Sequence, residues 1–128
     1  MFNLVMGKKI FIAEDDPEIS SLIQYTLETL GYQVQTCATG REVLDALRAF
    51  KPDVMLLDVM LPGVDGYSLA MQISEDVDLN QIPIVVITAL DPSKIMFQRF
   101  PQVAGFITKP FNTDDLTKTI ESILEKKK

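Results

Sequence analysis

The amino-acid sequence predicts an α/β protein built on an open, doubly wound parallel sheet of five strands with five helices. Short apolar runs alternate along the chain with stretches in which apolar residues recur at helical spacing. The runs at 54–57 and 84–87 are apolar at every position, which is typical of strands covered on both faces. Right-handed crossovers between such strands place helices on both sides of the sheet.

Each expected strand is a short run rich in apolar or β-branched residues and bounded by turn-forming residues. The expected strands are residues 8–14, 32–38, 54–58, 82–88 and 105–109. The first helix is expected over 17–30, with Asp16 as its N-cap and Pro17 as its first residue. The other expected helices are residues 40–50, 67–74, a short one over 93–100, and a long final helix capped by Thr113-Asp114-Asp115.

Length and composition restrict the class of protein. A chain of 128 residues can bury its own core, so we expect a single domain over residues 1–128. The formal charge of −6 disfavours direct nucleic-acid binding, which depends on neutralising phosphates. The one cysteine, Cys37, is expected to be buried and reduced, and no apolar run approaches the roughly 18 residues that span a membrane. We therefore expect a cytoplasmic protein with no membrane partner.

Polar residues gather where the expected strands end. In open α/β sheets, ligands bind beyond the carboxyl ends of the strands. The residues at these ends are Glu14-Asp15-Asp16, Asp58, Thr88 and Lys109. Asp58 is the most informative, because its carboxylate follows four apolar residues and would lose hydration there without a partner or an ion.

These residue types favour a magnesium site with a nucleophilic aspartate. Several carboxylates that converge on one crevice repel each other unless a cation lies between them. The chain has no histidine, so oxygen atoms are the available ligands, and oxygen ligands favour Mg²⁺. Lys109 and Thr88 offer a charge and a hydroxyl to a phosphoryl group. We therefore predict that Asp58 attacks phosphorus and forms an acyl phosphate.

Four segments resemble the receiver domains of two-component response regulators, in a chemotaxis-regulator-like form. The segments are IAEDDPEI, LLDVMLPGVDG, IPIVVITA and GFITKPF, and the resemblance covers nearly the whole chain. It implies a flavodoxin-like sheet with strand order 2-1-3-4-5. It also implies that a sensor histidine kinase or a phosphotransfer protein passes a phosphoryl group to the domain. A downstream output protein or domain would then bind the altered surface, with phosphorylation-dependent dimerisation as a further implication.

The resemblance also implies a role for individual residues. Asp58 would be the phosphoacceptor, Glu14 and Asp15 would hold Mg²⁺, and the carbonyl of Met60 would complete the metal site. The domain would not be an enzyme in its own right, beyond slow loss of its own phosphoryl group. Asp15 with Asp16 stays open as the alternative acidic pair, although Asp16 is the better candidate for helix capping.

The remaining implied roles concern the switch. Thr88 and Lys109 would contact the phosphoryl group, and Lys109–Pro110 would be a cis peptide. Phe106 would be the aromatic switch residue, or alternatively an ordinary core residue. A receiver-like module that works by protein contact without phosphorylation is the alternative function. Binding of a flavin phosphate is disfavoured, because the loop after the first strand is acidic.

Two features depart from the family pattern. The residues Phe100 to Val103 interrupt the region after the expected fourth helix, so that helix is expected to be short or displaced. Met60 and Leu90, two positions beyond Asp58 and Thr88, offer no polar side chain to orient an attacking water. We therefore predict slow self-dephosphorylation.

Overall fold

The computed structural model describes residues 7–89 and 96–126. Within these ranges five parallel strands form one sheet in the order β2-β1-β3-β4-β5, which confirms the predicted fold class and strand order. The strands are β1 (Lys9–Ala13), β2 (Gln33–Cys37), β3 (Val54–Asp58), β4 (Ile84–Thr88) and β5 (Val103–Thr108). Every residue of β3 and β4 is buried, as expected for strands in the middle of a doubly wound sheet.

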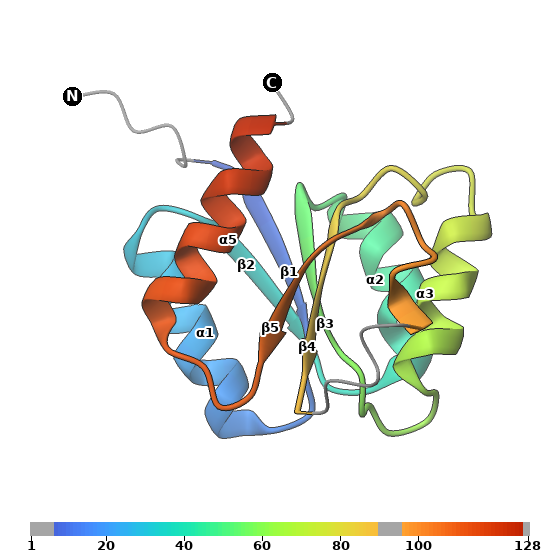
Figure 1. Cartoon of the computed structure of the whole chain (residues 1–128), viewed down its shortest axis with the longest axis horizontal. Helices are drawn as coiled ribbons and strands as arrows, with labels where there is room; N and C mark the ends of the chain where they lie inside the picture. The colour runs from blue at the N-terminus through green and yellow to red at the C-terminus, as the bar shows by residue number, and fades with distance from the viewer. Residues whose placement is uncertain (1–6, 90–95, 127–128) are drawn as a thin grey trace.

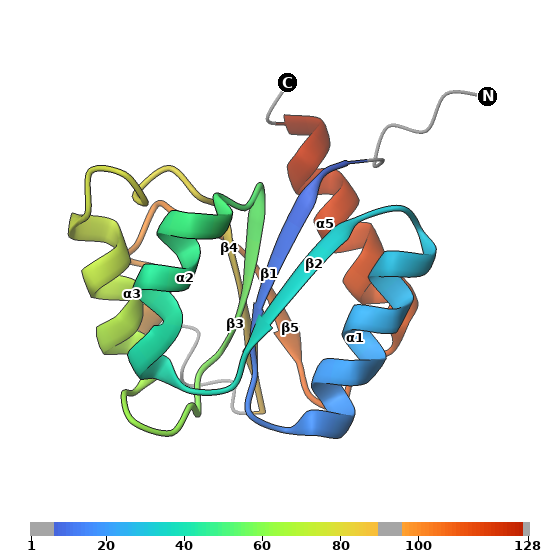
Figure 2. The same ribbon diagram turned by 180° about the vertical axis from the view of Figure 1, so that it is seen from behind.

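Helices cover both faces of the sheet (Figure 1). The helices α1 (Pro17–Thr29) and α5 (Thr113–Lys126) lie on one face, and α2 (Val43–Phe50) and α3 (Gly66–Glu75) lie on the other, as the reverse view also shows (Figure 2). Side chains of β1 alternate between the two cores: Phe11 packs in the α2–α3 core, whereas Ile10 and Ile12 pack in the α1–α5 core. No helix in the described ranges is long and apolar enough to cross a membrane.

Side chains cap the first and the last helix, and one of the two predicted caps is wrong. Asp16 caps α1 as predicted, because its carboxylate accepts hydrogen bonds from the N–H groups of Glu18 and Ile19 at 2.9 and 3.3 Å. The final helix is capped by Asn112, not by the three residues after it. The amide oxygen of Asn112 accepts from the N–H of Asp115 at 2.7 Å.

Several other expected boundaries also differ from the structure, among them the start of β4, which is Ile84 and not residue 82. The second helix was predicted over 40–50, but its first turn is the 3₁₀ segment η1 (Gly40–Glu42), and α2 follows it. The expected fourth helix, over 93–100, falls partly outside the described residues. Met96 and Phe97 are helical and the next two residues form a turn, so the helix stops before Phe100. The edge strand β5 begins at Val103, two residues earlier than predicted.

The sheet brings four predicted residues to one edge. Glu14 follows β1, Asp58 ends β3, Thr88 ends β4, and Lys109 follows β5. Because all five strands are parallel, their carboxyl ends lie on the same side of the sheet. The parallel order of the strands therefore places these residues at the same end of the sheet.

Candidate functional site

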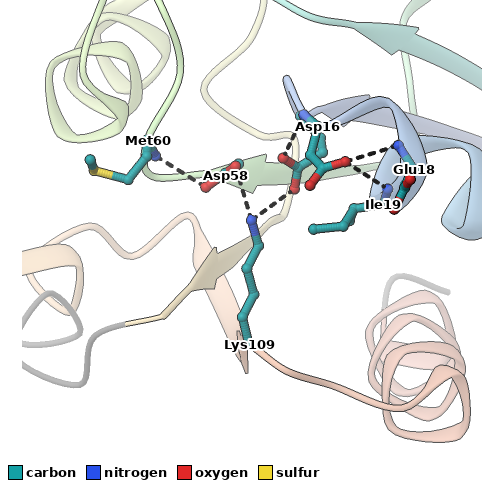
Figure 3. Close-up of polar contacts among 7 residues, drawn as sticks. Asp16, Glu18, Ile19, Asp58, Met60 and Lys109 are labelled. Atoms are coloured by element: carbon teal, nitrogen blue, oxygen red, sulfur yellow. Dashed lines mark hydrogen bonds and ion pairs between the residues drawn. The ribbon is translucent and has the colours of Figure 1, made fainter.

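Asp58 is a buried residue of the candidate site and is the last residue of the central strand β3. Its side chain is almost fully buried, with 3% of the residue exposed. One carboxylate oxygen accepts a hydrogen bond from the N–H of Met60 at 3.1 Å, and the other accepts from Lys109 Nζ at 3.2 Å (Figure 3). These contacts supply the partners that the apolar surroundings of Asp58 in the sequence required.

Glu14 is a second buried carboxylate beside Asp58. It follows β1 and is 1% exposed. Its Oε2 accepts a hydrogen bond from the N–H of Asp16 at 3.1 Å, and its Oε1 lies 3.2 Å from Lys109 Nζ. That Oε1 is buried and has no hydrogen-bond partner. Lys109 therefore forms ion pairs with two buried carboxylates at once.

The ionisation of these groups depends on burial and on their mutual charge. Burial and, to a smaller extent, the neighbouring Asp58 carboxyl raise the pKa of Glu14 to about 7, although the N–H of Asp16 and the Lys109 ammonium act in the opposite direction. Burial lowers the pKa of Lys109, but the negative charges of Asp58 and Glu14 outweigh it, so the pKa lies above its ordinary value. Lys109 therefore stays charged at neutral pH, whereas Glu14 is partly protonated at neutral pH.

Oxygen atoms of Glu14, Asp15 and Asp58 all lie within 4.8 Å of one another. Asp15 is exposed, so this cluster opens to solvent on one side. With every group ionised, the three carboxylates and Lys109 carry an excess of two negative charges. Oε1 of Glu14 has an ion pair with Lys109 but no hydrogen-bond partner, and with the oxygen-only donor set it fits a hard divalent cation such as Mg²⁺. Asp16 is not among the residues of this cluster, and its carboxylate instead caps α1.

The remaining predicted residues that the structure describes lie around this cluster of carboxylates or farther along the same strands. Thr88 is buried and lies one position beyond Ile87, the partner of Asp58 in the sheet register. The Lys109–Pro110 peptide is cis, the isomer that the resemblance implied. Phe106 is half-buried and packs against the α2–α3 core. The side chain of Met60 is 76% exposed, and Leu90 lies outside the described residues.

One part of the site was missed by reasoning from the sequence. The end of β2 and the connection that leads from it to α2 contact the segments that carry the site residues. The carbonyl of Cys37 accepts from the N–H of Glu14 at 3.0 Å, and the N–H of Gly40 donates to the carbonyl of Pro62 at 3.0 Å. The glycine in Thr39-Gly40 was the available signal, but it was interpreted only as the start of a helix.

A doubly wound sheet of this order with buried acids and a lysine at its carboxyl edge has the architecture of a receiver domain. The family model of the response regulator receiver domain matches residues 10–121. The chain therefore belongs to the response regulator receiver domain family, which confirms the resemblance seen in the sequence.

Individual relatives agree with this assignment. The chain is 34% identical over 128 residues to the alkaline phosphatase synthesis transcriptional regulatory protein PhoP of Bacillus subtilis (strain 168), across 94% of this chain and 50% of that protein. It thus spans about half the length of such curated relatives. The structure of the chemotaxis response regulator CheY4 of Vibrio cholerae is similar, with a TM-score of 0.85 and 27% identity over 92% of this chain and 99% of CheY4.

A third relative has a metal ion in the corresponding fold. The receiver domain of the sensor histidine kinase PA1611 from Pseudomonas aeruginosa PAO1 was solved with a magnesium ion coordinated in its active site cleft. It is 26% identical to this chain with a TM-score of 0.84, over 93% of this chain and 98% of that one.

Proposed function

We propose that Asp58 accepts a phosphoryl group from a sensor histidine kinase or a phosphotransfer protein in a reaction that requires Mg²⁺. The observation that carries this proposal is the cluster of oxygens from Glu14, Asp15 and Asp58 within 4.8 Å. Lys109 Nζ lies 3.2 Å from Asp58 and supplies the positive charge on the other side. Two-component signalling is the setting in which the family acts, and the magnesium ion in the PA1611 receiver domain supports the same metal here.

The residues of this chain would act mainly by position and charge. A carboxylate oxygen of Asp58 would form the new O–P bond while the bond between phosphorus and the donor nitrogen breaks, and its electron pair would leave with the donor. Lys109 and the hydroxyl of Thr88 would contact the phosphoryl oxygens. Glu14, Asp15, Asp58 and the carbonyl of Met60 would hold Mg²⁺, which when bound neutralises negative charge on the phosphoryl group.

The same proposal extends to the output of the domain. Movement of Thr88 toward the phosphoryl group, with Phe106 following, would alter the surface around β5 and α5. That surface would bind a downstream output protein or domain, or a second copy of the chain. We infer that residues 1–128 form one receiver domain, that it acts in the cytoplasm, and that the exposed apolar Met60 leaves the acyl phosphate long-lived.

The test is phosphorylation with a small donor. The purified chain is incubated with acetyl phosphate and Mg²⁺, and its intact mass is measured. We expect a gain of one phosphoryl group that EDTA prevents and Asp58→Asn abolishes. Asp45→Asn is the matched control, because Asp45 is an exposed aspartate on α2 and its replacement leaves the site unchanged.

Two results would contradict the proposal. The first is an unmodified wild-type chain under these conditions, which would favour a module that works by protein contact alone. The second is an adduct that persists in Asp58→Asn, which would place the acceptor elsewhere.

A further inference from the structure

The end of β2 and the connection that follows it contact two parts of the candidate metal site, the residue Glu14 and the loop after Asp58. Where β2 ends, the carbonyl of Cys37 accepts a hydrogen bond from the N–H of Glu14 at 3.0 Å and so continues the pairing of β1 with β2. In the connection itself, the N–H of Gly40 donates to the carbonyl of Pro62, also at 3.0 Å. Pro62 belongs to the loop of residues 59–65, which joins the phosphoacceptor strand to α3. One short segment therefore contacts both the strand end that carries Glu14 and the loop that follows Asp58.

The close approach at Gly40 requires the absence of a side chain. Gly40 is buried, and a Cβ atom there would overlap Val64 Cγ1 and lie 3.1 Å from Val64 Cβ. Val64 is β-branched and has few χ1 alternatives. Even after a rotation that moves Cγ1 away, its Cβ would stay closer to the new methyl than ordinary van der Waals contact allows. Any side chain at position 40 must therefore push the loop away from the β2–α2 connection.

The loop is also held where it meets α3. The N–H of Gly66 donates to the carbonyl of Val59 at 2.9 Å, and a Cβ atom on Gly66 would lie 2.8 Å from Val59 Cα. Between these two constraints lies Met60, whose N–H donates to the Asp58 carboxylate. Pro62 is bonded to Gly40, so a displacement of the β2–α2 connection from the loop acts on Pro62 as well as on Val64. With the Val59 end held, the part of the displacement that reaches Pro62 is absorbed by the two residues between them, Met60 and Leu61.

We propose that Gly40 is a positioning residue for the Mg²⁺ site, which it serves by letting the loop after Asp58 pack directly on the β2–α2 connection. This inference rests on the proposed function. Mg²⁺ requires nearly ideal octahedral geometry with ligands about 2.0–2.1 Å away, so small displacements of ligand-bearing backbone weaken it. Loss of groups that orient metal ligands typically lowers metal affinity about 10–100-fold. Gly40→Ala is expected to raise the Mg²⁺ Kd about tenfold.

Calorimetric titration with MgCl₂ alone tests the proposal on four proteins. These are the wild type, Gly40→Ala, Val64→Ala and the double variant that carries both changes. Val64→Ala removes the overlap with Cγ1 and leaves only the milder 3.1 Å contact with Cβ, so the double variant should bind Mg²⁺ within about threefold of Val64→Ala. Each protein is titrated well below its own Tm, measured by circular dichroism.

A matched control separates positioning from general destabilisation. A Cβ atom on Gly105, in β5, would lie 3.1 Å from Thr119 Cγ2, a milder crowding in a different part of the fold. Gly105→Ala should lower the Tm and leave the Mg²⁺ Kd unchanged.

The titrations distinguish failure of the role proposed for Gly40 from failure of the proposed function. A wild type that shows no heat of Mg²⁺ binding overturns the proposed function itself. A wild type that binds, with Gly40→Ala binding equally well at a lower Tm, overturns only the role of Gly40. A double variant that is folded but binds as weakly as Gly40→Ala also overturns it. Where Gly40→Ala does not fold, the comparison of the double variant with Val64→Ala decides.

Discussion

Ionisation of Glu14 is expected to oppose folding at neutral pH when no divalent cation is bound. Burial, with a contribution from Asp58, raises the pKa of Glu14 from 4.5 to about 7. An acid with a higher pKa in the folded state binds its proton more tightly there, so the free energy of unfolding falls as the pH rises from about 4.5 to 7. At 1.36 kcal/mol per pKa unit, this loss amounts to about 3 kcal/mol.

Glu14→Gln removes this effect with little change in shape. The amide cannot ionise, its oxygen can accept from the N–H of Asp16, and its NH₂ group can donate to Asp58. In EDTA at pH 8, the variant is expected to be more stable than the wild type by about 2–3 kcal/mol, and the difference should shrink toward zero near pH 5. With Mg²⁺ in excess, the stability difference between Glu14→Gln and the wild type should become smaller or change sign, because Mg²⁺ binding to the folded wild type adds stability.

Urea unfolding followed by circular dichroism between pH 5 and pH 8 measures this difference. Glu125→Gln, which changes an exposed glutamate near the end of α5, is the control and should follow the wild-type profile. The reasoning is refuted if the wild type gains stability relative to Glu14→Gln as the pH rises from 5 to 7 in EDTA.

Two further predictions concern lysines. Lys51 ends α2 in the left-handed region, with φ of 54°, so Lys51→Gly should raise the free energy of unfolding by about 0.5–1 kcal/mol. Lys51→Ala should give no such gain, and equal urea midpoints for both variants would show that backbone strain is not the cause. Lys109→Met leaves Glu14 and Asp58 without their shared cation, and should cost about 1–3 kcal/mol at pH 8 in EDTA. Unchanged thermal stability of that variant would contradict the ion-pair argument.

The sequence was sufficient to predict the five strands to within about two residues, and the end of the sheet at which the candidate site residues lie. Runs such as 54–57 have only apolar residues, and a run of that kind is stable only when covered on both faces. The N-cap at Asp16 was equally predictable, because a cap uses a side chain and the N–H groups two and three residues later. The ends of elements were harder to predict. The residue that caps α5 is Asn112 and not one of the three predicted residues, because several neighbouring polar residues can act as a cap.

The tertiary structure alone decided how the site residues are paired and charged. The raised pKa of Glu14 follows from burial beside Asp58, a residue 44 positions away on another strand. The packing of Gly40 on Val64 likewise joins two connections that no local pattern relates. Local preferences act over a few residues and can be read along the chain. Desolvation and close packing depend on which distant segments meet, so only the folded arrangement determines them.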